Sequence, residues 1–204
     1  MLRSTFIQLL AGYTSNTSLV NELWTEIEKN YSGKKRHYHN LQHLEHLLAQ
    51  LQPVQEAIKS WDTVLFTLFY HDIIYLAHRS DNEAKSAALA QQRLQQAGVN
   101  DNMISNCTAQ ILATKAHQAS TDPDTNYFTD ADLSILGQPW EVYETYYKNV
   151  RKEYAMYPDF LYNPGRKKVL HHFLSMDRIF KTNHFFGLLE APARANLQRE
   201  WTLL

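Results

Sequence analysis

One apolar segment limits most strongly what this chain can fold into, because it carries two polar side chains toward the interior. From Trp61 to Phe69 most residues are aromatic or aliphatic and only Asp62 is charged, which is typical of a buried helix. The segment ends in Tyr70-His71-Asp72, so an imidazole and a carboxylate would enter the core side by side. Burying an ionised carboxylate without a partner is costly. A divalent cation would remove that cost, since neutral imidazole and carboxylate oxygen are both good metal ligands.

The rest of the chain shows helical periodicity between sparse glycines and prolines, without any strand pattern, repeat or linker. We expect helices at about 18–30, 38–50, 54–75, 82–96, 101–117, 130–136, 139–157, 169–181 and 192–203. The polar stretch 118–125 is predicted to be a loop. The sequence therefore predicts an all-α protein, and 204 residues suit a single domain with a sizeable core.

The composition of the chain limits which partners it is expected to bind and in which cellular compartment we expect it. The 20 Lys+Arg residues nearly balance the 21 Asp+Glu residues, so no broad nucleic-acid surface or affinity for an anionic membrane is indicated. No apolar run is long enough to span a membrane, and the first residues do not resemble a secretion signal. The only cysteine, Cys107, cannot form an internal disulfide and is expected to be a small core residue. We therefore expect a cytoplasmic protein.

Two further motifs supply groups that bind metals. His39 and His43 stand four residues apart, so on a helix they would share one face. The acidic segment Asp130-Ala131-Asp132 lies downstream. Each motif alone is explained equally well by exposed histidines or by a helix cap. Together with His71 and Asp72, they could surround a divalent ion and leave positions open for water, as a catalytic site requires.

The order His43, His71-Asp72, Asp132 resembles the HD superfamily of metal-dependent phosphohydrolases, whose ligands are a histidine, a His-Asp doublet and a distant aspartate. The chain also resembles a branch of small bacterial proteins described as predicted HD phosphohydrolases. The segments that carry this second resemblance are Arg36-x-Tyr-His-Asn, Phe69-Tyr-His-Asp-Ile-Ile-Tyr, Asn82-Glu83-x-x-Ser86-Ala87, Asp130-x-Asp-Leu, Arg151-x-Glu-Tyr and Gly165-Arg166. The resemblance implies one HD-type domain over 1–204, with a metal-binding core at about 36–137 and C-terminal helices at 139–204 packed on it.

The same resemblance implies a set of site residues. His43, His71, Asp72 and Asp132 would ligate the metal, with Asp130 as a substitute for Asp132. Asp132 is preferred because it follows Ala and precedes a large residue, and Asp130 would then be a helix N-cap. The segment Tyr38-His39-Asn40-x-x-His43 is similar to one in cyclic-nucleotide phosphodiesterases, where the first histidine is the proton donor.

The implied reaction is hydrolysis of a phosphate ester or anhydride, with a nucleotide as the likeliest substrate class. Mn²⁺, Fe²⁺, Co²⁺, Ni²⁺ or Mg²⁺ could serve, because mixed nitrogen and carboxylate ligands select weakly among them. Asp72 or Asp132 would orient the attacking water, and His39 would protonate the departing oxygen. Glu83 could act as a base or as a ligand of a second metal, or it could simply favour the start of its helix. Alternative functions are a cyclic or linear nucleotide phosphodiesterase and a non-catalytic metal or nucleotide sensor.

Several basic residues are candidates for binding the substrate phosphate, and some of them also have a plain structural explanation. Arg36 offers a forked donor one turn before His39, but it could be a solvated charge at the start of a helix. The other candidates are Lys115, His117, Arg151 and Arg166. His117 could also ligate a second metal or stabilise a helix C-terminus, so one or two metals stay open. The apolar C-terminal residues 201–204 could form a contact between two copies of the chain.

Overall fold

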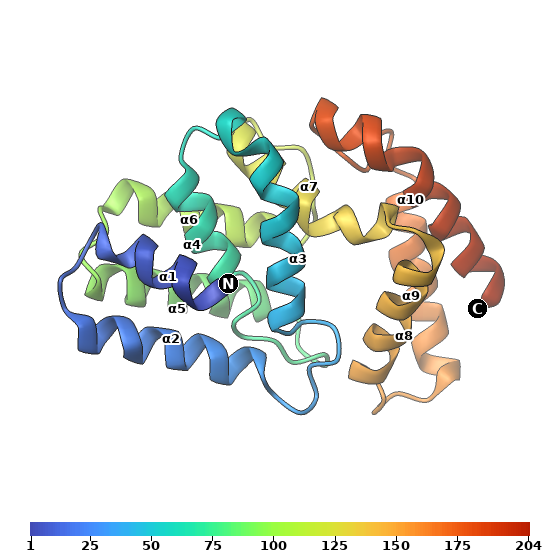
Figure 1. Ribbon diagram of the computed structural model, residues 1–204. Coiled ribbons are helices and arrows are strands. Elements are labelled where there is room, and N and C mark those ends of the chain that lie inside the picture. Colours follow the sequence, from blue (N-terminus) through green and yellow to red (C-terminus); the bar gives the residue numbers. More distant parts are fainter. The chain divides into compact units, whose positions relative to one another are not determined.

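The computed structural model describes all 204 residues and contains helices without strands, which confirms the all-α prediction (Figure 1). The α-helices are α1 (Leu2–Ala11), α2 (Thr17–Tyr31), α3 (Leu41–Leu51), α4 (Trp61–Tyr70), α5 (Asn82–Gln96), α6 (Asp101–Ala113), α7 (Pro123–Leu133), α8 (Trp140–Glu153), α9 (Asp159–Leu174) and α10 (Asn183–Leu203). Two short 3-10 helices, η1 (Gln52–Ala57) and η2 (Ser134–Gly137), follow α3 and α7. No helix combines the length and the apolar character needed to cross a membrane.

The chain divides into two compact units, Met1–Thr129 and Asp130–Leu204, and the division falls inside α7. In the first unit α5 packs on α6, α6 packs on α4, and α1 packs on α2. In the second unit α10 packs along η2 and α9. The expected single domain over 1–204 stays a prediction.

Helix α4 is the buried helix expected from the apolar segment. Every residue from Thr63 to Tyr70 is buried. The expected start near residue 54 is wrong, because the preceding residues form η1 and the chain then turns. Both carboxylate oxygens of Asp124 accept backbone N–H groups there, from Lys59 and Ser60 at 2.9 and 2.8 Å. A residue far along the chain therefore caps the start of α4.

Other helix boundaries also differ from the expected ones. Helix α1 was not expected; it buries Phe6, whose ring lies edge-on to Phe69 of α4 with centroids 4.9 Å apart. Helix α7 begins inside the predicted loop, because the Asp122 side chain accepts the N–H groups of its first turn. Helices α9 and α10 begin well before residues 169 and 192 and contain prolines in their interiors.

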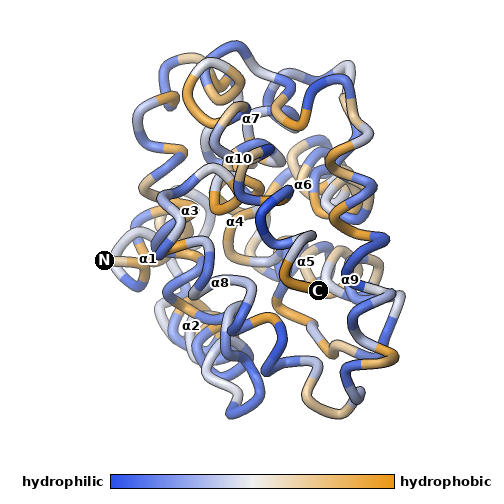
Figure 2. The backbone as a smooth tube through the Cα atoms, turned by 90° about the vertical axis from the view of Figure 1, so that its right-hand side faces the viewer, coloured by the Kyte–Doolittle hydropathy of each residue, from blue (hydrophilic) through white to orange (hydrophobic).

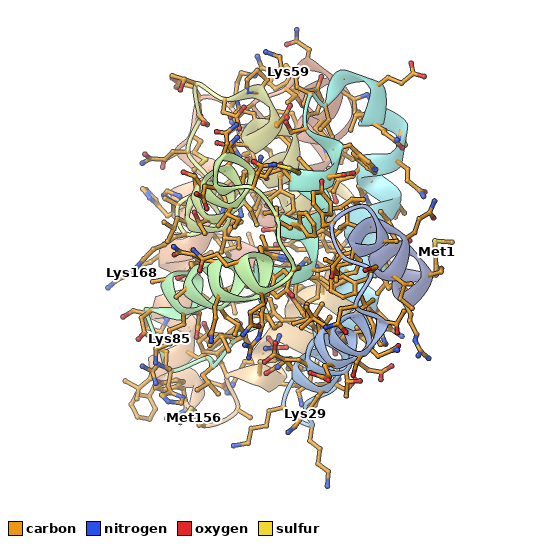
Figure 3. All side chains as sticks on the ribbon, turned by 90° about the vertical axis from the view of Figure 1, so that its left-hand side faces the viewer. Met1, Lys29, Lys59, Lys85, Met156 and Lys168 are labelled. Carbon is orange, nitrogen blue, oxygen red and sulfur yellow. The ribbon has the colours of Figure 1, made fainter.

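Several helices outside α4 are amphipathic, among them α2 and α3. Figure 2 shows hydrophilic and hydrophobic residues alternating along the helical turns. In α3 the leucines Leu44, Leu47, Leu48 and Leu51 are buried, as predicted. Exposed lysines such as Lys29 and Lys85 point away from the ribbon (Figure 3). The interior is therefore mostly apolar, and the polar residues buried in it call for an explanation.

Candidate metal centre

The start of α3 places His43 in the interior. The side-chain oxygen of Asn40 accepts the N–H groups of Gln42 and His43 and so caps the helix. His43 is 4% exposed, while His39 lies before the cap and outside the helix. The prediction that His39 and His43 share a helix face is therefore wrong, because the Asn40 cap sets the helix start after His39. Their rings are nevertheless neighbours, with centroids 6.0 Å apart.

The doublet His71-Asp72 lies in the turn that directly follows α4. His71 is 1% exposed, whereas the side chain of Asp72 is 18% exposed. The expectation that both residues are fully buried is thus correct only for His71. The backbone leaves the helix at this point, and the carboxylate reaches the edge of the interior.

Three imidazoles converge on the Asp72 carboxylate. Its Oδ2 lies 3.3 Å from Nε2 of His71 and 3.9 Å from Nε2 of His43. The Nε2 atom of His39 is 4.0 Å from the same oxygen. The Nε2 atoms of His43 and His71 are 3.1 Å apart. Four ligand-type side chains from two distant segments therefore gather at one place within the first unit.

The tautomer of His71 follows from its second nitrogen. Nδ1 lies 3.0 Å from the carbonyl oxygen of Leu68, one turn earlier, and a carbonyl can only accept a hydrogen bond. Nδ1 therefore carries a proton, and in the neutral imidazole Nε2 would present its lone pair toward His43 and Asp72. A backbone carbonyl that orients an imidazole in this way is a common feature of histidines that bind metals.

Helix α7 supplies a further carboxylate. One ligand atom from each of His43, His71 and Asp132 forms a group within 4.8 Å. Phe128, one turn before Asp132 in α7, places its ring edge-on to His71 at 5.5 Å. Asp130 is occupied elsewhere: its carboxylate accepts the N–H groups of Lys181 and Thr182 at 2.9 and 2.7 Å. The suggested role of Asp130 as the cap of its own helix is wrong, since it lies inside α7.

The donor set suits a divalent cation. The Nε2 atoms of His43 and His71 are 3.1 Å apart, close enough for both to bind one ion. Carboxylate oxygens from Asp72 and Asp132 would complete a mixed nitrogen and oxygen set, which transition metals and Mg²⁺ accept. The roles of these four residues as ligands stay predictions.

Arg36 contacts the protein's own backbone. Its guanidinium donates to the carbonyl oxygens of His39, Asp72 and Ile73 at 3.0, 2.7 and 2.8 Å. The structure therefore gives Arg36 a structural role that was not foreseen, and its role in binding substrate stays untested.

The contacts or positions of the other candidate residues can also be compared with their predicted roles. Lys115 donates to the carbonyl oxygen of Ser80 at 2.9 Å, and His117 adopts a positive φ of 51° in the turn after α6. Glu83 lies in the first turn of α5. In the second unit Arg151 pairs with Asp159, and Arg166 pairs with Glu200. Their proposed functional roles are neither supported nor contradicted by these contacts.

Aromatic residues around the centre were missed by sequence reasoning. Tyr75 stacks on His39 with centroids 3.9 Å apart and planes at 26°. Tyr38 packs against both His39 and His43. The Tyr31 hydroxyl accepts the N–H of Asp72 at 3.2 Å. The only available signal was the position of Tyr38 and Tyr75 close to the histidines, which does not separate them from ordinary core aromatics.

A comparison of the chain with protein-family models, with curated proteins and with solved structures finds no match. The chemistry of the centre is therefore the main basis on which its function can be proposed.

Proposed function

We propose that this protein is a divalent-metal-dependent phosphohydrolase of the HD type, which hydrolyses a phosphate ester or anhydride of a small molecule. The observation that carries the proposal is the group formed by His43, His71 and Asp132, whose ligand atoms lie within 4.8 Å. These residues are far apart in sequence, and a cation offers a common reason for bringing them together. A nucleotide is the proposed substrate class by family resemblance alone.

The residues of the centre divide into ligands and groups that handle protons. His43, His71, Asp72 and Asp132 would hold the ion. A divalent cation at such a site supplies Lewis acidity toward phosphoryl oxygens and lowers the pKa of water. Asp72, an acceptor when ionised, would also orient water for attack. His39 sits at the partly exposed edge, 18% exposed, where its imidazolium could donate a proton to the departing oxygen.

The identity and setting of the ion are also proposals. The mixed ligands suit Mn²⁺, Fe²⁺, Co²⁺, Ni²⁺ or Mg²⁺. The single cysteine, fully buried in the core, is typical of proteins from a reducing compartment and supports a cytoplasmic location.

The test combines metal analysis with a substrate screen. We expect the purified protein to contain about one transition metal ion per chain, or to bind one after removal of metal by a chelator. His71→Ala and Asp132→Asn should lose the metal and the activity toward a panel of phosphate monoesters, diesters and anhydrides. His184→Ala, which changes an exposed histidine, is the matched control and should retain both.

Different outcomes separate the alternatives. Full activity in His71→Ala and Asp132→Asn, or a wild-type protein that binds none of the five metals, would contradict the proposal. Cleavage confined to diesters would favour a phosphodiesterase. Metal-dependent nucleotide binding without turnover would favour a sensor.

A further inference from the structure

We infer that Tyr75 and Arg36 are positioning residues that hold His39 beside Asp72, so that the proton donor is in place before a substrate arrives. This inference rests on the proposed function, because it gives two further residues a role at the same proposed metal centre. It differs from the sequence-based expectation for Arg36, which was contact with the substrate phosphate.

His39 needs such support because no helix holds it. It lies in the irregular segment before the Asn40 cap, and its side chain is only partly buried. A side chain in such a segment would otherwise sample several rotamers. A general acid is effective only when its proton lies within hydrogen-bond reach of the departing oxygen.

The ring of His39 is held by a series of stacked groups. The Tyr75 ring lies nearly parallel to the imidazole, at 3.9 Å between centroids. The guanidinium carbon of Arg36 lies 5.7 Å from the centroid of Tyr75 and 4.9 Å from that of Tyr31. Stacking and cation–π contacts therefore connect Tyr31, Arg36, Tyr75 and His39 in that order.

The backbone of His39 is held by the same guanidinium. One nitrogen of Arg36 donates to the carbonyl oxygens of both His39 and Asp72, and another donates to that of Ile73. The planar fork thus ties the segment before α3 to the turn after α4. Tyr31 adds a second connection, because its hydroxyl accepts the N–H of Asp72. Both the ring and the main chain of His39 are consequently fixed relative to the Asp72 carboxylate.

The first experiment is a double-mutant cycle on hydrolysis. Removing a general acid costs about 10²–10⁴ in rate, and His39→Ala sets that limit. Tyr75→Leu should lower kcat at least about ten-fold, within that limit, while KM and metal content stay near the wild-type values. Tyr75→Phe, which keeps the ring, should restore kcat. Tyr75→Leu/His39→Ala should be no slower than His39→Ala alone, because the two residues act as one unit.

Controls separate positioning from damage to the fold. Tyr147→Leu removes a partly buried tyrosine of α8 and should leave kcat unchanged. Arg36→Lys keeps the charge but replaces the planar fork of two nitrogens with a single ammonium nitrogen, so it should also lower kcat. If Tyr75→Leu does not fold, Tyr75→Gln takes its place in the cycle.

A second measurement does not depend on activity. Ring currents of Tyr75 should shift the His39 ring protons upfield in the NMR spectrum, and this shift should vanish in Tyr75→Leu but persist in Tyr75→Phe. Unchanged His39 signals and unchanged kcat in Tyr75→Leu would overturn the inference and leave the proposed function intact. A wild-type protein that binds no metal and hydrolyses none of the phosphates would overturn the proposed function even if the His39 signals behaved as expected.

Discussion

At the scale of single residues, burial decides what a side chain can do chemically. Cys107 in α6 is fully buried, as the sequence analysis expected. Burial raises the pKa of its thiol to about 12. The reactive thiolate is therefore scarce at neutral pH, which argues against a nucleophilic role.

This burial predicts a slow thiol reaction. At pH 8 a pKa of about 12 leaves about one thiolate in 10⁴ molecules. We expect a disulfide reagent such as DTNB to leave Cys107 almost unmodified in the folded protein and to react with it fully in concentrated urea. Absorbance of the released thiolate measures both rates. Complete reaction within seconds without urea would show that α6 does not bury the thiol.

At the scale of secondary-structure elements, carboxylates in and next to α7 accept hydrogen bonds from the backbone of several segments. Asp122 caps α7 itself, and Asp124 caps α4. Asp130 accepts N–H groups immediately before α10. One ligand atom of Asp132 lies within 4.8 Å of ligand atoms of His43 and His71. One short helix and the residue before it therefore combine structural carboxylates with the carboxylate proposed as a metal ligand.

Substitutions of Asp130 and Asp132 should separate the stability of the fold from metal binding. Asp130 is fully buried, and Asp130→Ala would leave two N–H groups and the Lys181 ammonium without their acceptor. We expect a loss of roughly 3 kcal/mol in the free energy of unfolding. Asp132→Ala should instead lose the metal, which Asp130→Ala should retain. Urea unfolding and metal titration of both variants would measure this; the reverse pattern would exchange the roles of the two residues.

The cap of α7 also predicts a dependence on pH. Burial acts to raise the pKa of Asp122, but hydrogen bonds from Thr125 and from the Asp124 N–H outweigh it and lower the pKa below its usual range. A lowered pKa in the folded state adds stability above the unfolded-state pKa, and this stability is lost as the pH falls through the folded-state value. Asp122→Ala should therefore cost about 1 kcal/mol at pH 7 and less in acid. Urea unfolding at pH 7 and pH 3 checks this, and an equal loss at both values would contradict it.

At the scale of the whole molecule, each of the two units has its own polar anchor. In the second unit Arg166 pairs with Glu200 through two hydrogen bonds of 2.7 and 2.8 Å, and Tyr143 donates to the same carboxylate. All three side chains are buried. The network joins α8, α9 and α10. In the first unit the Arg36 guanidinium has the corresponding role. It donates to the carbonyl oxygens of His39, before α3, and of Asp72, after α4.

Breaking the buried pair should destabilise the second unit strongly. Arg166→Met leaves an uncompensated carboxylate and should cost roughly 3–5 kcal/mol in the free energy of unfolding. Arg166→Met/Glu200→Leu should recover most of this loss, because no buried charge remains. Urea unfolding measures both. The double variant also tests Arg166 as a substrate ligand: we expect an unchanged KM, and a raised KM would support the substrate-binding role that was predicted for Arg166.

The sequence alone was sufficient for features that depend on neighbouring residues. The all-α class and the buried helix α4 follow from the periodicity and composition of short segments. The candidate residues His43, His71 and Asp132 were selected because their types and order resemble the ligands of the HD superfamily, and their ligand atoms lie within 4.8 Å of one another.

Only the tertiary structure decided features that depend on residues distant in the chain. Asp124 binds the backbone at the start of α4 from 64 positions away, a contact that no local pattern could predict. Arg36 donates to carbonyls 36 and 37 positions along the chain, and Asp130 accepts N–H groups 51 and 52 positions away. A side chain's type limits which bonds it can form, but its partners are chosen by which segments the packed helices bring within reach.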